Sequence, residues 1–400
     1  MRVLMVISQF YPIIGGAEKQ AQLLARKLTE KGIQVEVVTG QWKLKTPRKE
    51  IIDGVRIFRN FSFWGVLGIK GLRPVAALIY MATLGIYLIV HRRKYDIVHV
   101  HQVLYPAFIA VLVGKSILKK LVLAKNACTG LTGDIKYIKR FPFGKLQLKY
   151  LMKHLDCLVA VNEEGILEFK SAGFPETKIQ HIPNGVPPSL GRKIKSDEAL
   201  YVISTVRLDR QKGIDVLLKA WSKVVAQEKT LKLLILGQGP LESELKKLAK
   251  SLEIIDYVNF VGLVNDPDEY LRKSDIFVLP SRAEGMSNAL LEAMCIGLSC
   301  IATNISGNKE LISENSKKPV LLGEFVIEKN GILINPDDVE GLSEAILYLI
   351  RNRIGREEIG NEGRLHIEKN YSIDLIADKY IALYQRMLKG NSKCVVSVEK

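Results

Sequence analysis

The sequence predicts an α/β protein with two doubly wound parallel sheets that face each other across a cleft. Short runs rich in Val, Ile and Leu alternate with helical patterns through both halves of the chain, which is typical of parallel sheets covered by helices on both faces. The chain has 400 residues, more than one hydrophobic core usually supports. We therefore expect two Rossmann-like domains.

The predicted strands form two series. The first consists of RVLMVIS, VEVVT, DIVHVH, LVLAK, DCLVAVN and KIQHIPNG, and the second of LYVISTV, KLLILG, VNFVG, IFVLPS and SCIAT. Between them, GVPPSLGRKIKSDEA combines Pro, Gly and polar residues, which indicates a linker. We place the domains at 1–185 and 199–372, with the linker at 186–198. Because ligands bind beyond the carboxyl ends of parallel strands, chemistry is expected on the strand-to-helix loops.

The net charge of +16 lies entirely in the first half of the chain. Residues 1–190 contain 28 Lys and Arg against 12 Asp and Glu, whereas residues 191–400 contain 30 of each. This asymmetry favours a polyanionic partner, either nucleic acid or an anionic membrane, with solubility as the alternative. The five cysteines are scattered without CxxC spacing, so neither a disulfide framework nor a zinc site is indicated. The N-terminal stretch is expected to be a buried strand and not a signal peptide.

A basic loop follows the first predicted strand of the second series. VRLDRQKG places Arg207, Arg210 and Lys212 just before a helix. Cations beside a helix N-terminus suit a diphosphate, because side chains and helix dipole act on the same negative charge. A solvated basic loop is the alternative.

A second helix start lies in SRAEGMSNALLEAMCIG, residues 281–297. Ser287 or Asn288 can cap this helix. Its first backbone N–H groups then offer another anion site, at Asn288, Ala289 and Leu290.

Two glutamates flank that helix start. Glu284 precedes the helix, and Glu292 lies about two turns into an apolar stretch. A buried carboxylate requires an ion partner or hydrogen-bond donors. The hydroxyl groups of a ribose are donors of this kind, and a structural ion pair is the alternative for Glu292.

Three glycines and a histidine are further candidates. Gly237 follows a predicted strand, and Gly15 and Gly16 precede the first helix, where the backbone could approach a ligand closely. Ordinary turns are the alternative. His101 ends DIVHVH and is a candidate substrate contact or a packing residue; its surroundings show no further zinc ligands at suitable spacing.

Several motifs occur in order along the chain: GGAE (15–18), DIVHVH (96–101), IPNGV (182–186), VRLDRQKG (206–213), GQGPLESEL (237–245), VGLV (261–264) and LPSRAEGMSNALLEAMCIG (279–297). Together they resemble the retaining glycosyltransferases of GT-B fold, family four. Glu284 and Glu292 correspond to the E-x7-E signature of that family.

The resemblance implies that the second domain binds a nucleotide-sugar, with Arg207 and Lys212 on the diphosphate. Glu284 would bind the transferred sugar and Glu292 the ribose. The remaining implied contacts are the amides of 288–290 to phosphate and sugar, Gly16 near the diphosphate, and His101 to the sugar.

The resemblance also implies a mechanism. No metal or other cofactor is expected, since the two cations stabilise the leaving group. Substitution would be front-face, with the donor phosphate accepting the proton of the acceptor. Residues 373–390 resemble the last helix of the family, which crosses back to the first domain. Residues 391–400 are expected to be a tail.

The chain departs from the family pattern beyond Ile305, where SGNKE replaces the usual Gly-Gly pair, and 313–330 form a longer connection. Pro-Pro also follows IPNGV in place of the usual Asp. Sugar contacts from 307–310 are therefore left open. A UDP-sugar is the expected donor because such donors are common among relatives.

The acceptor has to be inferred from the basic half. Lys145, Lys149 and Lys153 recur every four residues beside leucines, and Lys139 and Arg140 precede them. A basic amphipathic helix suits an anionic bilayer surface, with an ordinary surface helix as the alternative.

Residues 74–90 form an apolar stretch, which we expect to be a buried or interfacial helix because a core strand follows it. We therefore expect a lipid-linked saccharide acceptor and a peripheral position at the inner face of the cytoplasmic membrane. A soluble small-molecule or phosphosugar acceptor is the alternative. Less favoured are a non-catalytic nucleotide or nucleic-acid binding protein, a phosphorylase and an epimerase.

Overall fold

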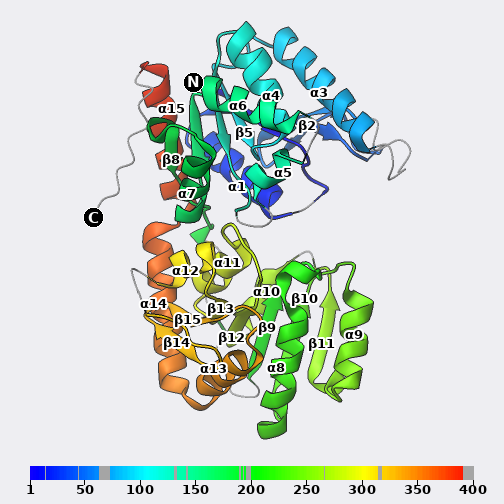
Figure 1. Ribbon diagram of the computed structural model, residues 1–400, viewed down its shortest axis with the longest axis vertical. Helices are drawn as coiled ribbons and strands as arrows, with labels where there is room; N and C mark the ends of the chain where they lie inside the picture. The colour runs from blue at the N-terminus through cyan, green and yellow to red at the C-terminus, as the bar shows by residue number, and fades with distance from the viewer. Residues whose placement is uncertain are drawn as a thin grey trace. The chain divides into compact units, whose positions relative to one another are not determined.

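The computed structural model forms two compact units (Figure 1). Unit 1 comprises Met1–Gly185 and Ile373–Lys400, and unit 2 comprises Val186–Ser372. The structure describes residues 1–390 except 14, 44, 63–72, 130–132, 141–142, 189–190, 192, 195–199, 265 and 314–317, and the side chains of 73 and 74.

Unit 1 contains an eight-stranded sheet in the order β3-β4-β2-β1-β5-β6-β7-β8, parallel except for the pair β3 and β4. The strands are β1 (Arg2–Ile7), β2 (Gln34–Gln41), β3 (Lys49–Ile52), β4 (Val55–Phe61), β5 (Ile97–His101), β6 (Leu121–Lys125), β7 (Cys157–Ala160) and β8 (Ile179–His181). The α-helices are α1 (Gly16–Glu30), α3 (Arg73–Val90), α4 (Tyr105–Ile109), α5 (Asp134–Ile138), α6 (Gly144–His154), α7 (Glu163–Ala172) and α15 (Ile373–Leu388), and a π-helix, η2 (Ala110–Ile117), extends α4.

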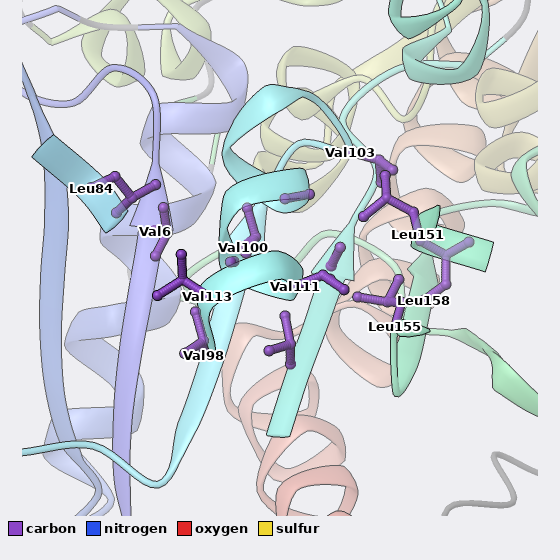
Figure 2. Packing of buried hydrophobic residues seen from close by; sticks show 14 of the residues in the cluster. Val6, Leu84, Val98, Val100, Val103, Val111, Val113, Leu151, Leu155 and Leu158 are labelled. Atoms are coloured by element: carbon purple, nitrogen blue, oxygen red, sulfur yellow. The ribbon is translucent and has the colours of Figure 1, made fainter. Parts of the chain in front are cut away.

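Alternation along β5 divides the core of unit 1 into two layers, because successive strand residues point to opposite faces. Val98 and Val100 pack with residues of α3, η2 and α6 (Figure 2). Ile97 packs on the other face with residues of α1 and α15. Helices therefore cover both faces of the sheet.

Unit 2 contains a seven-stranded sheet in the order β11-β10-β9-β12-β13-β15-β14, parallel except for the pair β14 and β15. The strands are β9 (Tyr201–Thr205), β10 (Lys232–Leu236), β11 (Val258–Gly262), β12 (Ile276–Leu279), β13 (Ser299–Thr303), β14 (Phe325–Glu328) and β15 (Gly331–Ile334). The helices are η6 (Arg210–Lys212), α8 (Ile214–Gln227), α9 (Glu242–Ser251), η7 (Ile255–Tyr257), α10 (Pro267–Arg272), α11 (Asn288–Ile296), α12 (Ser306–Ile312), α13 (Val339–Arg351) and α14 (Arg353–Asn370).

The predicted fold class is confirmed, because both units are doubly wound and mostly parallel α/β structures. Each run singled out in the sequence contains a strand. The sequence did not single out β3, β4, β14 or β15, and two antiparallel edge pairs are consequently additions to the predicted parallel sheets.

The apolar stretch expected at 74–90 forms α3. One side of this helix is buried in unit 1, with Tyr80 and Leu84 in the core. Its other side exposes large apolar residues: Val75, Leu78, Ile86, Ile89 and Val90. Within the described ranges, no helix combines the length and apolar character needed to cross a membrane.

Candidate functional site

The helix start predicted around Ser287 begins at Asn288, the first residue of α11. Ser287 is the cap, and its hydroxyl oxygen accepts a hydrogen bond from the backbone N–H of Leu290 at 3.3 Å. The backbone N–H of Leu290 was predicted to donate a hydrogen bond to phosphate, but in this structure it donates to the cap residue. Glu292 is the fifth residue of α11 and is buried, so it lies just over one turn into the helix and not two.

Lys212 and Glu284, which are 72 residues apart in sequence, form an ion pair. Their Nζ and Oε1 atoms are 2.6 Å apart, and the side chains are only 21% and 8% exposed. The Ser281 hydroxyl donates to the same carboxylate oxygen at 2.8 Å. Because a buried carboxylate is costly without partners, this pair explains how both charges are held at one place.

Arg207, the other predicted phosphate ligand, is mainly exposed and is held by Asp209. The Arg207 Nε donates to Asp209 Oδ2 at 2.6 Å. The other Asp209 oxygen accepts from the backbone N–H of Gln211, which caps η6. One carboxylate thus orders both the arginine and the short helix before α8.

Arg282, which the sequence interpretation missed, joins the loops that carry Lys212 and Glu284. Its guanidinium donates to both oxygens of Asp215, at 2.9 and 2.7 Å, and to Asp337 at 2.7 Å. Although burial opposes ionisation of Asp215, the hydrogen bonds from Arg282 hold its pKa below the ordinary value. No single motif contained this signal, because Asp215 lies 67 residues away in sequence.

Gly213 and Gly237 explain two of the turns in unit 2. Gly213, at φ +66°, starts α8, and a Cβ there would lie 2.0 Å from the carbonyl oxygen of Pro280. Gly237, at φ +126°, would place a Cβ 1.9 Å from the carbonyl oxygen of Val206. Such close approaches exclude any side chain, so both glycines are needed by the backbone itself.

A polar line runs from α12 to the Glu284 loop. Thr303 donates its hydroxyl to the carbonyl of Ser281 at 2.6 Å, and the Asn308 amide lies 3.3 Å from the Thr303 hydroxyl. The Asn308 oxygen is buried without a hydrogen-bond partner. The SGNKE segment, which departs from the family pattern, thus packs against the loop that carries Glu284.

In unit 1, Gly15 and Gly16 lie at the start of α1. Gly15 is the N-cap residue with extended backbone, and Gly16 is the first helical residue. A Cβ on Gly15 would lie 2.4 Å from a carboxylate oxygen of Glu18. Burial raises the pKa of Glu18.

His101 lies at the carboxyl end of β5 and is buried with His99. The two rings stack with centroids 4.4 Å apart. Burial lowers the pKa of both, and the neighbouring Lys125 lowers it further. Burial also lowers the pKa of Lys125 itself, to about 7.

The predicted membrane-facing side chains are exposed in the structure. They are Lys139, Arg140, Lys145, Lys149 and Lys153. On the opposite side of α6, Leu148 and Leu151 are buried in the core of unit 1. Burying one leucine contributes about 1.5–3 kcal/mol, so this packing fixes which side of α6 faces solvent.

Two mostly parallel α/β sheets, one in each unit, are the architecture of the GT-B fold. Residues 14–190 match Glycosyltransferase Family 4, and residues 190–366 match Glycosyl transferases group 1. The chain belongs to this family, and it transfers a sugar from a nucleotide-sugar.

Curated relatives include an uncharacterized glycosyltransferase of Methanocaldococcus jannaschii, 27% identical over 96% of this chain and 98% of that protein. N-acetyl-alpha-D-glucosaminyl L-malate synthase of Bacillus anthracis is 24% identical over 95% and 96%. N-acetylgalactosamine-N,N'-diacetylbacillosaminyl-diphospho-undecaprenol 4-alpha-N-acetylgalactosaminyltransferase of Campylobacter jejuni is 27% identical over 69% and 73%.

Two solved structures share the fold. Sucrose-phosphate synthase from Thermosynechococcus elongatus has a TM-score of 0.77 and 18% identity, covering 98% of this chain and 100% of that one. Anabaena HepE in complex with UDP has a TM-score of 0.73 and 16% identity, covering 96% and 100%.

Proposed function

We propose that this protein is a retaining, metal-independent glycosyltransferase that moves a hexosyl or N-acetylhexosaminyl group from a UDP-sugar to a lipid-linked saccharide. The reaction would take place at an anionic membrane surface, with the protein peripheral at the inner face of the cytoplasmic membrane. The observation that carries the donor half is the pair of Lys212 and Glu284 in the loops before α8 and α11.

Lys212 and Arg207 bind the diphosphate of the donor. In the structure each is held by a carboxylate, Glu284 and Asp209 respectively. A diphosphate has a higher density of negative charge than one carboxylate, so it can replace Glu284 as the ion partner of Lys212. Both cations then stabilise the charge that develops on the leaving nucleotide, as a metal ion would.

Glu284 binds the transferred sugar once Lys212 turns to the phosphate. Its carboxylate then accepts hydrogen bonds from sugar hydroxyls, while Ser281 still donates to it. Glu292 on α11 accepts from the ribose. The first amides of α11, at Asn288 and Ala289, add partial positive charge near the phosphate.

Unit 1 contributes Gly16 near the diphosphate and His101 against the sugar. Both lie where a parallel α/β sheet binds ligands: Gly16 starts the helix after β1, and His101 ends β5. UDP is the proposed nucleotide because HepE, which shares the fold, has been solved with UDP and with UDP-glucose.

The charge of unit 1 supports a membrane-bound acceptor. Residues 73–155 contain 14 Lys and Arg but only two acidic residues, Asp96 and Asp134. Asp96 is paired with Arg2, and Asp134 is buried. An exposed basic residue near an anionic bilayer contributes on the order of 1 kcal/mol to binding, so this segment can hold the protein at the surface.

The exposed side of α3 adds an apolar contribution. Leu78 and Ile86, two turns apart, are 64% and 61% exposed, and the basic residues 92–94 follow the helix. Apolar and basic side chains combined on one helix are typical of interfacial binding. The name of the Campylobacter jejuni relative specifies an undecaprenol-linked acceptor, which supports the same proposal.

A soluble acceptor is the second candidate. The Bacillus anthracis relative is named as an N-acetyl-alpha-D-glucosaminyl L-malate synthase and matches 95% of this chain, so family membership alone favours neither acceptor class. In that case the basic surface would attract a small anionic acceptor instead of a lipid.

Product analysis tests the proposal. Purified protein is incubated with UDP-sugars and either an undecaprenyl-diphosphate saccharide in anionic vesicles or L-malate. We expect transfer to the lipid-linked acceptor with retained anomeric configuration, and its loss in Glu284→Gln. Transfer to malate alone would favour the second candidate, and an inverted product would contradict the retaining assignment.

A further inference from the structure

A cluster of buried polar side chains lies on the α15 side of the unit 1 sheet. It consists of His99, His101, Lys125, Tyr380 and Tyr384. The two imidazole rings stack at 4.4 Å with an angle of 20° between their planes. A hydrogen bond of 2.7 Å joins His99 Nδ1 to the Tyr384 hydroxyl. A helix nearly 300 residues away in sequence thus fixes the histidine pair.

Lys125 supplies the one positive charge of this cluster. It ends β6 directly beside His101 in the parallel register, so both side chains point to the same face. Its Nζ donates to Asn184 Oδ1 at 2.8 Å and lies 5.9 Å from the ring centroid of Tyr380. Among the residues that the structure describes, no carboxylate forms an ion pair with it.

Among the described residues, no carboxylate contributes to the shifted pKa of either histidine. Tyr380 and Tyr384 come from α15, and burial raises the pKa of both. Cys157 from β7 is buried on the same face. From α1, the neutral Gln20 is bonded to Gly185, next to Asn184. A proton added to either histidine would therefore face an uncompensated lysine.

We propose that Lys125 is a positioning residue: its ammonium group, buried beside the stacked rings and held by Asn184, takes up the proton that this cluster binds and so keeps His101 neutral. The importance of this for transfer rests on the proposed contact between His101 and the sugar. The effect on His101 itself does not depend on that contact.

A neutral imidazole carries one donor and one acceptor, whereas an imidazolium has two donors and no acceptor. The Nε2 atoms of His99 and His101 are both buried without a hydrogen-bond partner. With Lys125 charged first, His101 keeps the same hydrogen-bonding pattern toward a sugar hydroxyl at acidic pH. An ordinary histidine would lose its acceptor near pH 6.5.

Histidine titration by NMR tests the proposal on the full chain without donor or acceptor. The chain has six histidines, and the signal lost in His101→Gln identifies His101. We expect its titration midpoint to rise by at least one pH unit in Lys125→Met, which keeps the side-chain length but removes the charge. In Lys125→Arg, which stays charged, the midpoint should not rise. An unchanged midpoint in Lys125→Met would overturn the proposal.

A measurement on the unmodified protein covers the case in which the variants fold poorly. With carbon-13-labelled lysine, the Lys125 signal should titrate near neutral pH; a midpoint above pH 9 would overturn the proposal. In transfer assays, Lys125→Met should lose kcat/KM below pH 6.5 more steeply than wild type. If the NMR midpoint moves while this pH profile does not, the proposed sugar contact of His101 fails and the role of Lys125 stands.

Discussion

The two units accommodate buried positive charge in opposite ways. In unit 2 the cations near the proposed donor site have carboxylate partners: Lys212 has Glu284, and Arg282 has Asp215. In unit 1 the more deeply buried Lys125 is held, within the described part of the chain, by the amide of Asn184 and the ring of Tyr380, and not by a carboxylate. The pKa of Lys125 is accordingly lowered by burial to about 7.

This difference matches what each unit is proposed to do. A cation that must receive a diphosphate is best kept charged and in place, and a carboxylate does both until the ligand takes over. A histidine that must stay neutral is best placed beside a cation with no carboxylate nearby. We therefore expect paired charge to prepare unit 2 for an anionic ligand. In unit 1, burial lowers the pKa of His99 and His101 most, and we expect Lys125 to add to that effect.

The largest expected effect is on Lys212. In Lys212→Met, kcat/KM for transfer should fall on the order of 10²–10³-fold, because a preset charge at the leaving group is lost. The loss of the ion pair with Glu284 should also lower the unfolding free energy of the protein by about 2 kcal/mol. Steady-state kinetics and urea unfolding check these results.

Two variants separate the two losses. Lys212→Met combined with Glu284→Gln should recover stability but not transfer. Lys219→Met, at an exposed position of α8, should behave as wild type. Normal transfer by the Lys212→Met protein would contradict the proposed role of the paired lysine in unit 2.

Lys125 should make the unfolding free energy of the protein depend on pH. Between about pH 7 and 10.5 the unfolded state binds the Lys125 proton and the folded state does not, so wild-type stability rises with pH in this window. From pH 7 to 9 wild type should therefore gain on the order of 2–3 kcal/mol relative to Lys125→Met. Urea unfolding at both pH values measures the difference; a constant difference would show that Lys125 stays charged in the fold.

Membrane binding should depend on lysines of unit 1 and not on those of unit 2. Lys145→Gln with Lys149→Gln, on α6, should weaken binding to anionic vesicles by about 2 kcal/mol, or on the order of 30-fold. The matched control is Lys247→Gln with Lys250→Gln, two exposed lysines of α9 in unit 2. Equal losses in both double variants, in a flotation assay, would mean that binding depends on net charge alone.

Arg282 should show the smallest effect. Arg282→Ala removes the link between the loops before α8 and α11. It should lower the unfolding free energy by about 1–2 kcal/mol, a modest loss because the side chain is partly exposed. Arg282→Lys should recover part of this but not the bidentate contact with Asp215. Transfer should show a raised KM for donor; an unchanged KM would mean that the loops hold their places without Arg282.

The sequence predicted the features that depend on local pattern. Runs of β-branched residues located the main strands, and Ser287 and Asn288 were the two candidates for the cap of α11, of which the structure has Ser287. The edge strands β3 (KEII) and β14 (FVIE) are only four residues long and partly exposed, so they were missed.

Contacts between distant residues could not be read from spacing. Lys212 and Glu284 were singled out separately for phosphate and sugar, and nothing in either motif shows that they pair. His99 and Tyr384 are 285 residues apart. Lys125 ends an apolar run, where a lysine suggests an exposed strand end; only the packed α15 reveals that it is buried.

The most direct test of the donor site is a thermal-shift panel of UDP-, GDP- and ADP-sugars with wild type, Lys212→Ala and Lys219→Ala. We predict that a UDP-sugar raises the melting temperature of wild type and Lys219→Ala by several degrees and leaves Lys212→Ala unchanged. Equal shifts in all three proteins would contradict the proposed role of Lys212, and a shift with GDP- or ADP-sugars alone would contradict the choice of UDP.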